Sequence, residues 1–118
     1  MKTILVVDDD PEIRKLMKII LSRKGYGIIE AEDGSIALDL AKQKLPDLVI
    51  TDVMMANVNG FMLYELLRDE PATKKIPVIF VTGEAQRAGA WQSDPNVSYL
   101  EKPIDTNQLL NAVKKSLR

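Results

Sequence analysis

Short apolar runs alternate with longer segments in which apolar residues recur at helical spacing, from one end of the chain to the other. Four runs have the length of strands, at residues 4–7, 48–51, 78–81 and 97–101, and residues 28–29 predict a short second strand. Such alternation predicts a parallel sheet with helices on both faces, and the near-continuous apolar character of the runs fits strands buried on both sides. We therefore expect an α/β fold in a single domain spanning residues 1–118.

The first and last predicted helices carry clear start signals. Asp10 followed by Pro11 is typical of an N-cap with proline at the first helical position, and Gly25 fits the end of this helix. Asp105 with Gln108 three residues later resembles a capping box and predicts the start of the last helix.

The middle of the chain is less evenly patterned. Apolar spacing predicts helices around residues 36–41 and 63–67, each limited by a proline a few residues further on. The stretch before the fifth strand allows a short helix at residues 85–91, followed by a turn at residues 93–95. The whole pattern amounts to five strands and about five helices.

Composition narrows the class of protein. With 46% apolar and 28% charged residues and a net charge of −1, the chain favours neither direct nucleic acid binding nor an anionic membrane surface. No apolar stretch approaches the roughly 18 residues of a membrane span. The chain has no cysteine and no signal-peptide pattern, which fits a cytoplasmic protein. It also has no histidine, which excludes histidine-based catalysis and metal ligation within the chain.

Polar residues follow four of the predicted strands at the point where each ends. They are the carboxylates of Asp8, Asp9 and Asp52, the hydroxyl of Thr82 and the ammonium of Lys102. Because the carboxyl ends of parallel strands share one edge, these groups should meet in one crevice. Carboxylate oxygens suit Mg²⁺, and a carboxylate beside Mg²⁺ can accept a phosphoryl group while a lysine holds another phosphoryl oxygen.

Each of these residues also has an ordinary interpretation. Asp8 could be an ordinary acidic loop residue, and its neighbour Asp10 is explained by helix capping without any chemical role. Asp52 and Thr82 are residue types that are common in turns. The agreement of four strand ends favours a phosphoryl-transfer site over these separate interpretations. In that site Tyr99 could swing inward when Thr82 turns toward a phosphoryl group.

This combination resembles the response-regulator receiver domain of two-component signalling, over essentially the whole chain (residues 2–117). The residues that carry the resemblance are Asp8-Asp9, Asp52, Met54-Met55, Gly60, Thr82-Gly83, Tyr99 and Lys102-Pro103. The resemblance implies a flavodoxin-like sheet of five parallel strands in the order 2-1-3-4-5. It also implies a protein that is not an enzyme in the usual sense and catalyses only its own phosphorylation and dephosphorylation.

By the same resemblance, Asp52 is the phosphoacceptor and Lys102 pairs with the phosphoryl group. Asp9 and Asp52 bind Mg²⁺ directly, Asp8 acts mainly through water, and the backbone carbonyl of Met54 is the third protein ligand.

The resemblance further assigns the conformational switch to Thr82 and Tyr99, and the Lys102–Pro103 peptide bond is often cis in such proteins. The phosphoryl donor is a phosphohistidine on a histidine kinase or a histidine phosphotransfer protein, which acts in trans because this chain lacks histidine. Basic residues of the first helix either help to dock that donor or form a solvated face; they are Arg14, Lys15, Lys18, Arg23 and Lys24.

The chain also departs from the family pattern. Ala56 and Asn59 replace a usual proline and a common aspartate, and the stretch at residues 84–98 is short and lacks the usual Gly-Ala pair before Tyr99. This leaves the output surface open, with Trp91 either a packing anchor or a partner contact. Met54 lies beside the path of the hydrolytic water in relatives and is predicted to slow loss of the phosphoryl group.

The sequence also bears on functions other than a phosphoacceptor switch. A phosphorylation-independent scaffold is the main alternative, although the complete acidic set argues against it. No nucleotide-binding glycine motif follows the first strand, and Met54 stands where a haloacid-dehalogenase-type phosphatase has a second aspartate. A downstream target protein, a missing output domain and a homodimer all stay open as partners.

Overall fold

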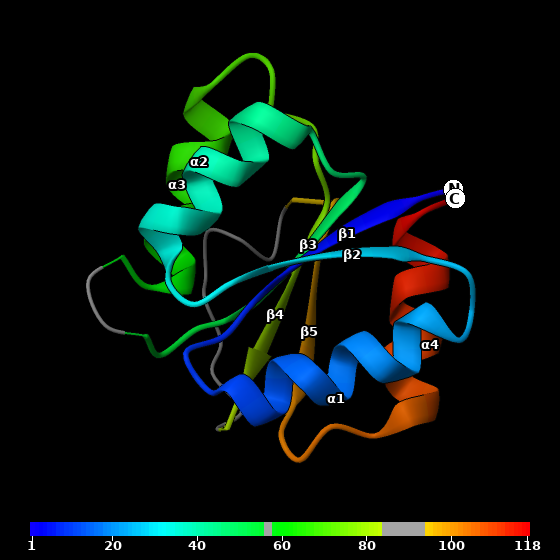
Figure 1. Ribbon diagram of the computed structural model, residues 1–118. Coiled ribbons are helices and arrows are strands. Elements are labelled where there is room, and N and C mark those ends of the chain that lie inside the picture. The colour runs from blue at the N-terminus through cyan, green and yellow to red at the C-terminus, as the bar shows by residue number, and fades with distance from the viewer. Residues whose placement is uncertain (56–57, 84–93) are drawn as a thin grey trace.

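The chain forms a five-stranded parallel sheet with helices on both faces (Figure 1). The computed structural model describes residues 1–55, 58–83 and 94–118. Within these residues the strands are β1 (Thr3–Val7), β2 (Gly27–Ala31), β3 (Leu48–Asp52), β4 (Val78–Thr82) and β5 (Val97–Glu101). The helices described there are α1 (Pro11–Ser22), α2 (Gly34–Lys44), α3 (Gly60–Asp69) and α4 (Thr106–Ser116).

The strand order is β2-β1-β3-β4-β5, which confirms the predicted flavodoxin-like order. Every neighbouring pair is parallel, so all five strands end at the same edge of the sheet. The register pairs Val7 with Thr51 and Asp52 with Val81, which brings the polar residues after β1, β3 and β4 into one row. The helix predicted at residues 85–91, with Trp91, lies outside the described residues.

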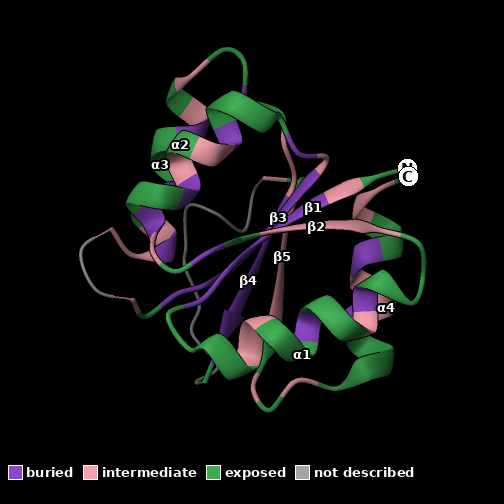
Figure 2. Cartoon of the chain, viewed as in Figure 1, coloured by how far each residue is buried: buried purple, intermediate pink, exposed green. Residues whose placement is uncertain are grey.

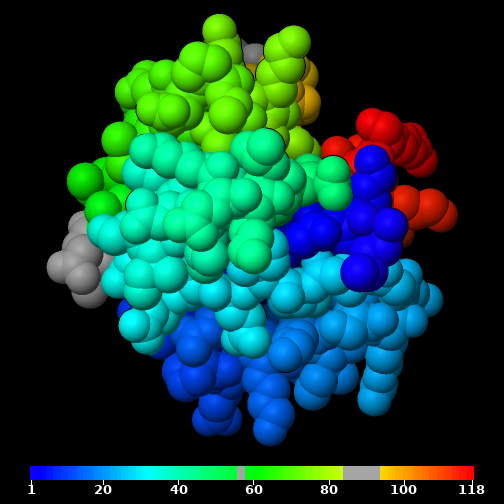
Figure 3. All heavy atoms as spheres, turned by 45° about the horizontal axis from the view of Figure 1, so that its top comes forward, coloured from blue at the N-terminus to red at the C-terminus, as the bar shows by residue number. Residues whose placement is uncertain are grey.

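Two apolar cores form because successive strand residues point to opposite faces of the sheet. Ile4 and Val6 of β1 pack with α1 and α4 on one face, and Leu5 and Val7 pack with α2 and α3 on the other. Figure 2 shows that the central strands β1, β3 and β4 are buried, that the edge strands β2 and β5 are mostly intermediate, and that the helices have exposed outer sides. In the space-filling view of Figure 3, side chains of α2 and α3 lie against each other over their side of the sheet.

Helix ends follow the predicted signals. The side chain of Asp10 accepts a 2.9 Å hydrogen bond from the backbone N–H of Glu12, and Asp105 does the same for Gln108. A cap that was not predicted from the sequence is Asn59, whose side-chain oxygen accepts a 2.9 Å hydrogen bond from the N–H of Met62 at the start of α3. A capping side chain satisfies a backbone donor that the helix itself leaves unpaired, so the local sequence is sufficient to place these ends.

Not all apolar residues of α1 lie in the core. Met17 and Leu21 of α1 are fully buried, but Leu16 is 44% exposed although it lies three residues after Ile13 and four before Ile20, which both pack against the core. The apolar face of α1 is therefore wider than the face that the sheet covers. Among the described residues, no helix is both long and apolar enough to cross a membrane.

Candidate functional site

Three carboxylates meet where β1 and β3 end. Asp8 and Asp52 are buried and Asp9 is exposed, yet one oxygen from each lies within 4.8 Å of the others. The sheet brings Asp8 and Asp52 together because β1 and β3 are neighbours. The cluster predicted from the strand ends is therefore present.

Asp8 is held through its backbone and its side chain. Its N–H donates to the carbonyl of Ala31 at 3.2 Å, its carbonyl accepts from Nη1 of Arg14 at 2.6 Å, and its Oδ1 accepts from the N–H of Asp10 at 2.9 Å. Burial, reinforced by the charge of nearby Asp52, raises the pKa of Asp8 above its usual value. A nearby positive charge would favour the ionised form of this carboxylate and so offset the effect of burial.

Lys102 supplies one positive charge to the cluster. Its Nζ lies 3.3 Å from Oδ2 of Asp52 and 3.5 Å from Oδ2 of Asp8. Burial alone would lower the pKa of Lys102, but these two carboxylates outweigh it and raise the pKa. The Lys102–Pro103 peptide bond is cis, as predicted, and the N–H of Lys102 donates to the carbonyl of Thr82 at 2.8 Å.

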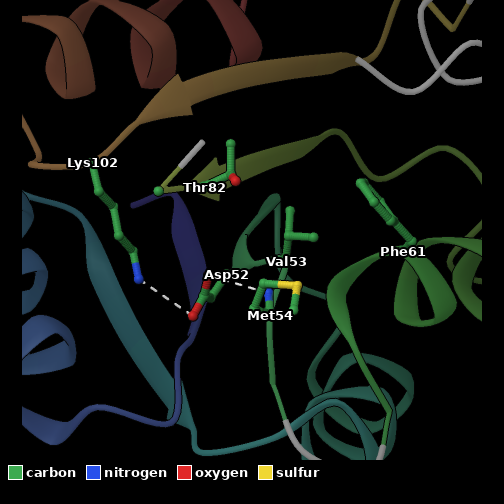
Figure 4. Close-up of a pocket in the computed structure, with 7 residues that line it drawn as sticks. Asp52, Val53, Met54, Phe61, Thr82 and Lys102 are labelled. Carbon is green, nitrogen blue, oxygen red and sulfur yellow. Dashed lines mark hydrogen bonds and ion pairs between the residues drawn. The ribbon is translucent and has the colours of Figure 1, made fainter. Parts of the chain in front are cut away.

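The cluster opens into a cavity of about 590 Å³, which Figure 4 shows in close-up. Its lining residues are Asp52, Val53, Met54, Phe61, Thr82, Gly83 and Lys102. The Asp52 carboxylate lies between Lys102 on one side and Met54 on the other (Figure 4). The N–H of Met54 donates to Oδ1 of Asp52 at 3.4 Å. Through this cavity the otherwise buried carboxylate of Asp52 can be reached from outside.

The carboxylate cluster fits a divalent cation. Oδ2 of Asp8 is buried and accepts no hydrogen bond from any residue that the structure describes. Together with Asp9 and Asp52 it offers hard oxygen ligands of the kind Mg²⁺ prefers. A ligand role for the Met54 carbonyl stays a prediction.

Tyr99 lies on the α2 and α3 side of the sheet, next to Phe80. The two ring centroids are 5.4 Å apart, and Phe80 also packs edge-on against Phe61, which lines the cavity. The Tyr99 hydroxyl is buried without a hydrogen-bond partner in the described part of the chain, and burial raises its pKa. Aromatic contacts thus connect Tyr99 to the cavity wall, while the switch roles of Tyr99 and Thr82 stay predictions.

Two polar networks near the site were not anticipated from the sequence. Arg14, considered only as part of a basic helix face, contacts Asp8 and also pairs with Glu30 of β2 at 3.2 Å. Tyr64 and Arg68 of α3 both bind Asp94. The opposite charges were visible in the sequence, but nothing local indicated that they would meet.

A flavodoxin-like sheet that gathers three carboxylates, a lysine and a buried threonine at one edge defines a receiver-type signalling domain. The family model of the response regulator receiver domain matches residues 4–114. The chain therefore belongs to the response regulator receiver domain family, and its place is in two-component signalling.

Individual relatives agree. Protein PilH of Pseudomonas aeruginosa is 34% identical over 99% of this chain and 98% of its own length. The DNA-binding dual master transcriptional regulator RpaA of Synechocystis is 38% identical, but this chain spans only 50% of it. Chemotaxis protein CheY4 of Vibrio cholerae superposes with a TM-score of 0.91 at 28% identity over 99% of both chains. The receiver domain of the hybrid histidine kinase CckA gives 0.83 at 32% identity, covering 98% of this chain and 99% of that one.

Proposed function

We propose that this chain, as one receiver domain over residues 1–118, is a phosphorylation-controlled switch whose phosphoacceptor is Asp52. The observation that carries the proposal is the position of the Asp52 carboxylate, 3.3 Å from the Lys102 ammonium and within 4.8 Å of the Asp8 and Asp9 ligand atoms, at the mouth of a cavity. No other described acid combines these neighbours with such access.

The donor is a phosphohistidine of a histidine kinase or histidine phosphotransfer protein. A carboxylate oxygen of Asp52 forms a bond to phosphorus, the bond from phosphorus to the imidazole nitrogen breaks, and the leaving imidazole takes up a proton. Asp8, Asp9, Asp52 and the Met54 carbonyl would hold Mg²⁺, which when bound neutralises charge on the phosphoryl oxygens. Lys102 neutralises a further phosphoryl oxygen from the opposite side.

The Thr82 hydroxyl then turns toward the phosphoryl group, and Tyr99 follows it inward. The 2.8 Å hydrogen bond from the Lys102 N–H to the Thr82 carbonyl supports this coupling, because it joins the ends of β4 and β5. The phosphorylated form would act on a downstream target protein, on an output domain or through a homodimer, in the cytoplasm.

Intact mass spectrometry after incubation with acetyl phosphate and Mg²⁺ tests the proposal. We expect the parent to gain one phosphoryl group, and to gain none without Mg²⁺ or as Asp52→Asn. The exposed Asp39→Asn variant is the matched control and should gain the group as the parent does.

A parent that takes up no phosphoryl group, from acetyl phosphate or from a panel of phosphorylated kinases, would contradict the proposal. That outcome would support a phosphorylation-independent scaffold instead.

A further inference from the structure

We propose that Arg14 is a positioning residue of the metal site, which holds the acidic turn after β1 in place and thereby strengthens Mg²⁺ binding. The inference rests on the proposed function, since it concerns the same carboxylate cluster. Arg14 belongs to α1 and touches none of the three cluster carboxylates in any contact that the described residues make. Its effect would therefore pass through the backbone.

The central contact is short and charged. Nη1 of Arg14 donates a 2.6 Å hydrogen bond to the carbonyl oxygen of Asp8. The Arg14 side chain is only 16% exposed, so water competes weakly for this carbonyl. Hydrogen bonds with a charged donor are stronger than neutral ones.

The guanidinium is itself held from the neighbouring strand. Its Nε donates to Oε1 of Glu30 at 3.2 Å, and Glu30 lies beside Val6 in the register of β2 with β1. Arg14 thus links α1, β2 and the end of β1 through two different nitrogens. A lysine has a single nitrogen and lacks the planar fork that makes two such bonds.

The carbonyl that Arg14 fixes belongs to the peptide unit between Asp8 and Asp9. The hydrogen bond from the N–H of Asp8 to Ala31 holds the peptide unit before Asp8. The hydrogen bond from Arg14 holds the peptide unit after it. Asp9 follows directly and has an exposed side chain that must reach the same ion as two buried carboxylates. Fixing the peptide unit orders Asp9 before the ion arrives.

The charge of Arg14 and its positioning contact predict opposite effects on the affinity for Mg²⁺. A cation beside three carboxylates repels Mg²⁺, so removal of the Arg14 charge would by electrostatics alone tighten Mg²⁺ binding. Loss of the positioning contact would weaken binding. Lys18 provides the matched control, because its Nζ lies 3.8 Å from the same Glu30 but its described contacts do not include the Asp8 carbonyl.

The test is a titration of unphosphorylated protein with Mg²⁺ alone, followed by backbone amide NMR shifts. Arg14→Lys keeps the charge, Arg14→Met removes it, and Lys18→Met removes a charge of the control residue. We expect both Arg14 variants to bind Mg²⁺ about tenfold more weakly than the parent, the usual scale for residues that support metal ligands. Lys18→Met should bind as tightly as the parent or slightly more tightly.

A second readout needs no metal. The Asp10 N–H, which donates to Oδ1 of Asp8, should exchange with solvent faster in Arg14→Lys, while amides of the buried strands keep their parent rates. If Arg14 only stabilised the fold, the substitution would speed exchange of the Asp10 N–H and of the buried-strand amides alike. Arg14→Lys keeps a long cationic side chain, so this variant remains informative if Arg14→Met does not fold.

The outcomes separate the two proposals. Arg14 variants that bind Mg²⁺ as tightly as the parent, or more tightly, would overturn the positioning role and leave the phosphoacceptor function intact. A parent whose Asp8, Asp9 and Asp52 amides do not respond to Mg²⁺ would contradict the metal site, and with it both proposals.

Discussion

The hydroxyl of Tyr64 donates a 2.6 Å hydrogen bond to Oδ2 of Asp94, which ties α3 to the turn that enters β5. Nε of Arg68 binds the same oxygen at 3.1 Å, and the Arg68 guanidinium lies 4.7 Å from the centre of the Tyr64 ring. Tyr64 also packs edge-on against Phe80, the neighbour of Tyr99. This Asp94 cluster therefore anchors the part of the sheet that carries Tyr99.

Removing the hydroxyl tests the strength of this anchor. Tyr64→Phe should lower the free energy of unfolding by about 2 kcal/mol, because a partly buried hydrogen bond to a charged group is lost. Denaturant unfolding measures the change, and a cycle with Asp94→Asn isolates the pair. Tyr26→Phe is the control, since no hydrogen bond of its hydroxyl occurs in the described part of the chain. Equal effects of Tyr64→Phe and Tyr26→Phe would argue against the anchor.

The same cluster predicts a dependence on pH. Burial alone would raise the pKa of Asp94, but hydrogen bonds from Tyr64, the Asn96 N–H and Arg68 outweigh it and lower the pKa. A lowered folded-state pKa means that ionised Asp94 stabilises the fold above its unfolded pKa, roughly 3.9, and that this contribution is lost as pH falls through the folded pKa.

The parent should thus exceed Asp94→Asn in free energy of unfolding at neutral pH, and the difference should shrink below about pH 4. Unfolding curves of both proteins across this range measure it. A difference that stays constant down to acid pH would show that the charge of Asp94 contributes nothing.

Removing the hydroxyl of Tyr99 should change the free energy of unfolding in the opposite direction to removing that of Tyr64. Its hydroxyl is buried without a described hydrogen-bond partner, so Tyr99→Phe removes an unsatisfied group and should raise the free energy of unfolding by about 1 kcal/mol. Chemical unfolding of the unphosphorylated protein measures this change. A loss of stability as large as that of Tyr64→Phe would mean that the hydroxyl is satisfied in solution.

Gly60 is required by a close approach of two backbone segments. A Cβ at this position would collide with the carbonyl oxygen of Asp52 and lie 3.1 Å from Cα of Val53. Neither atom can move freely, so Gly60→Ala should cost about 1–3 kcal/mol of unfolding free energy. Gly83→Ala is the control, because a Cβ there meets no atom of the described residues within 4 Å. Equal stability of the two variants in thermal unfolding would contradict the prediction.

Met54 is 77% exposed and lines the cavity beside Asp52. If this apolar side chain hinders the attacking water, Met54→Asn should shorten the phosphorylated lifetime severalfold, since an amide can hydrogen-bond that water. The lifetime is measured by mass spectrometry after the phosphoryl donor is removed. Met62→Asn, at an exposed position of α3, should leave it unchanged; an unchanged lifetime in Met54→Asn would refute the idea.

Local sequence patterns were enough to predict most of the helices and strands and the residue types of the site. The caps at Asp10 and Asp105 were predictable because a cap depends only on residues within three positions of it. Polar residues at the ends of four of the five predicted strands indicated the crevice, because parallel strands end at one edge. The strand order and individual roles came from the family resemblance, and the order is confirmed.

Contacts between residues of different elements could not be predicted from the sequence and are seen only in the folded chain. Arg14 reaches the Asp8 carbonyl because α1 packs beside the end of β1, and Tyr64 reaches Asp94 across 30 positions of sequence. Leu16 matches the helical spacing of Ile13 and Ile20, which pack against the core, but is exposed because the sheet covers only part of the apolar face of α1. Such contacts depend on how whole elements pack, and periodicity along one element does not encode the position of its neighbours.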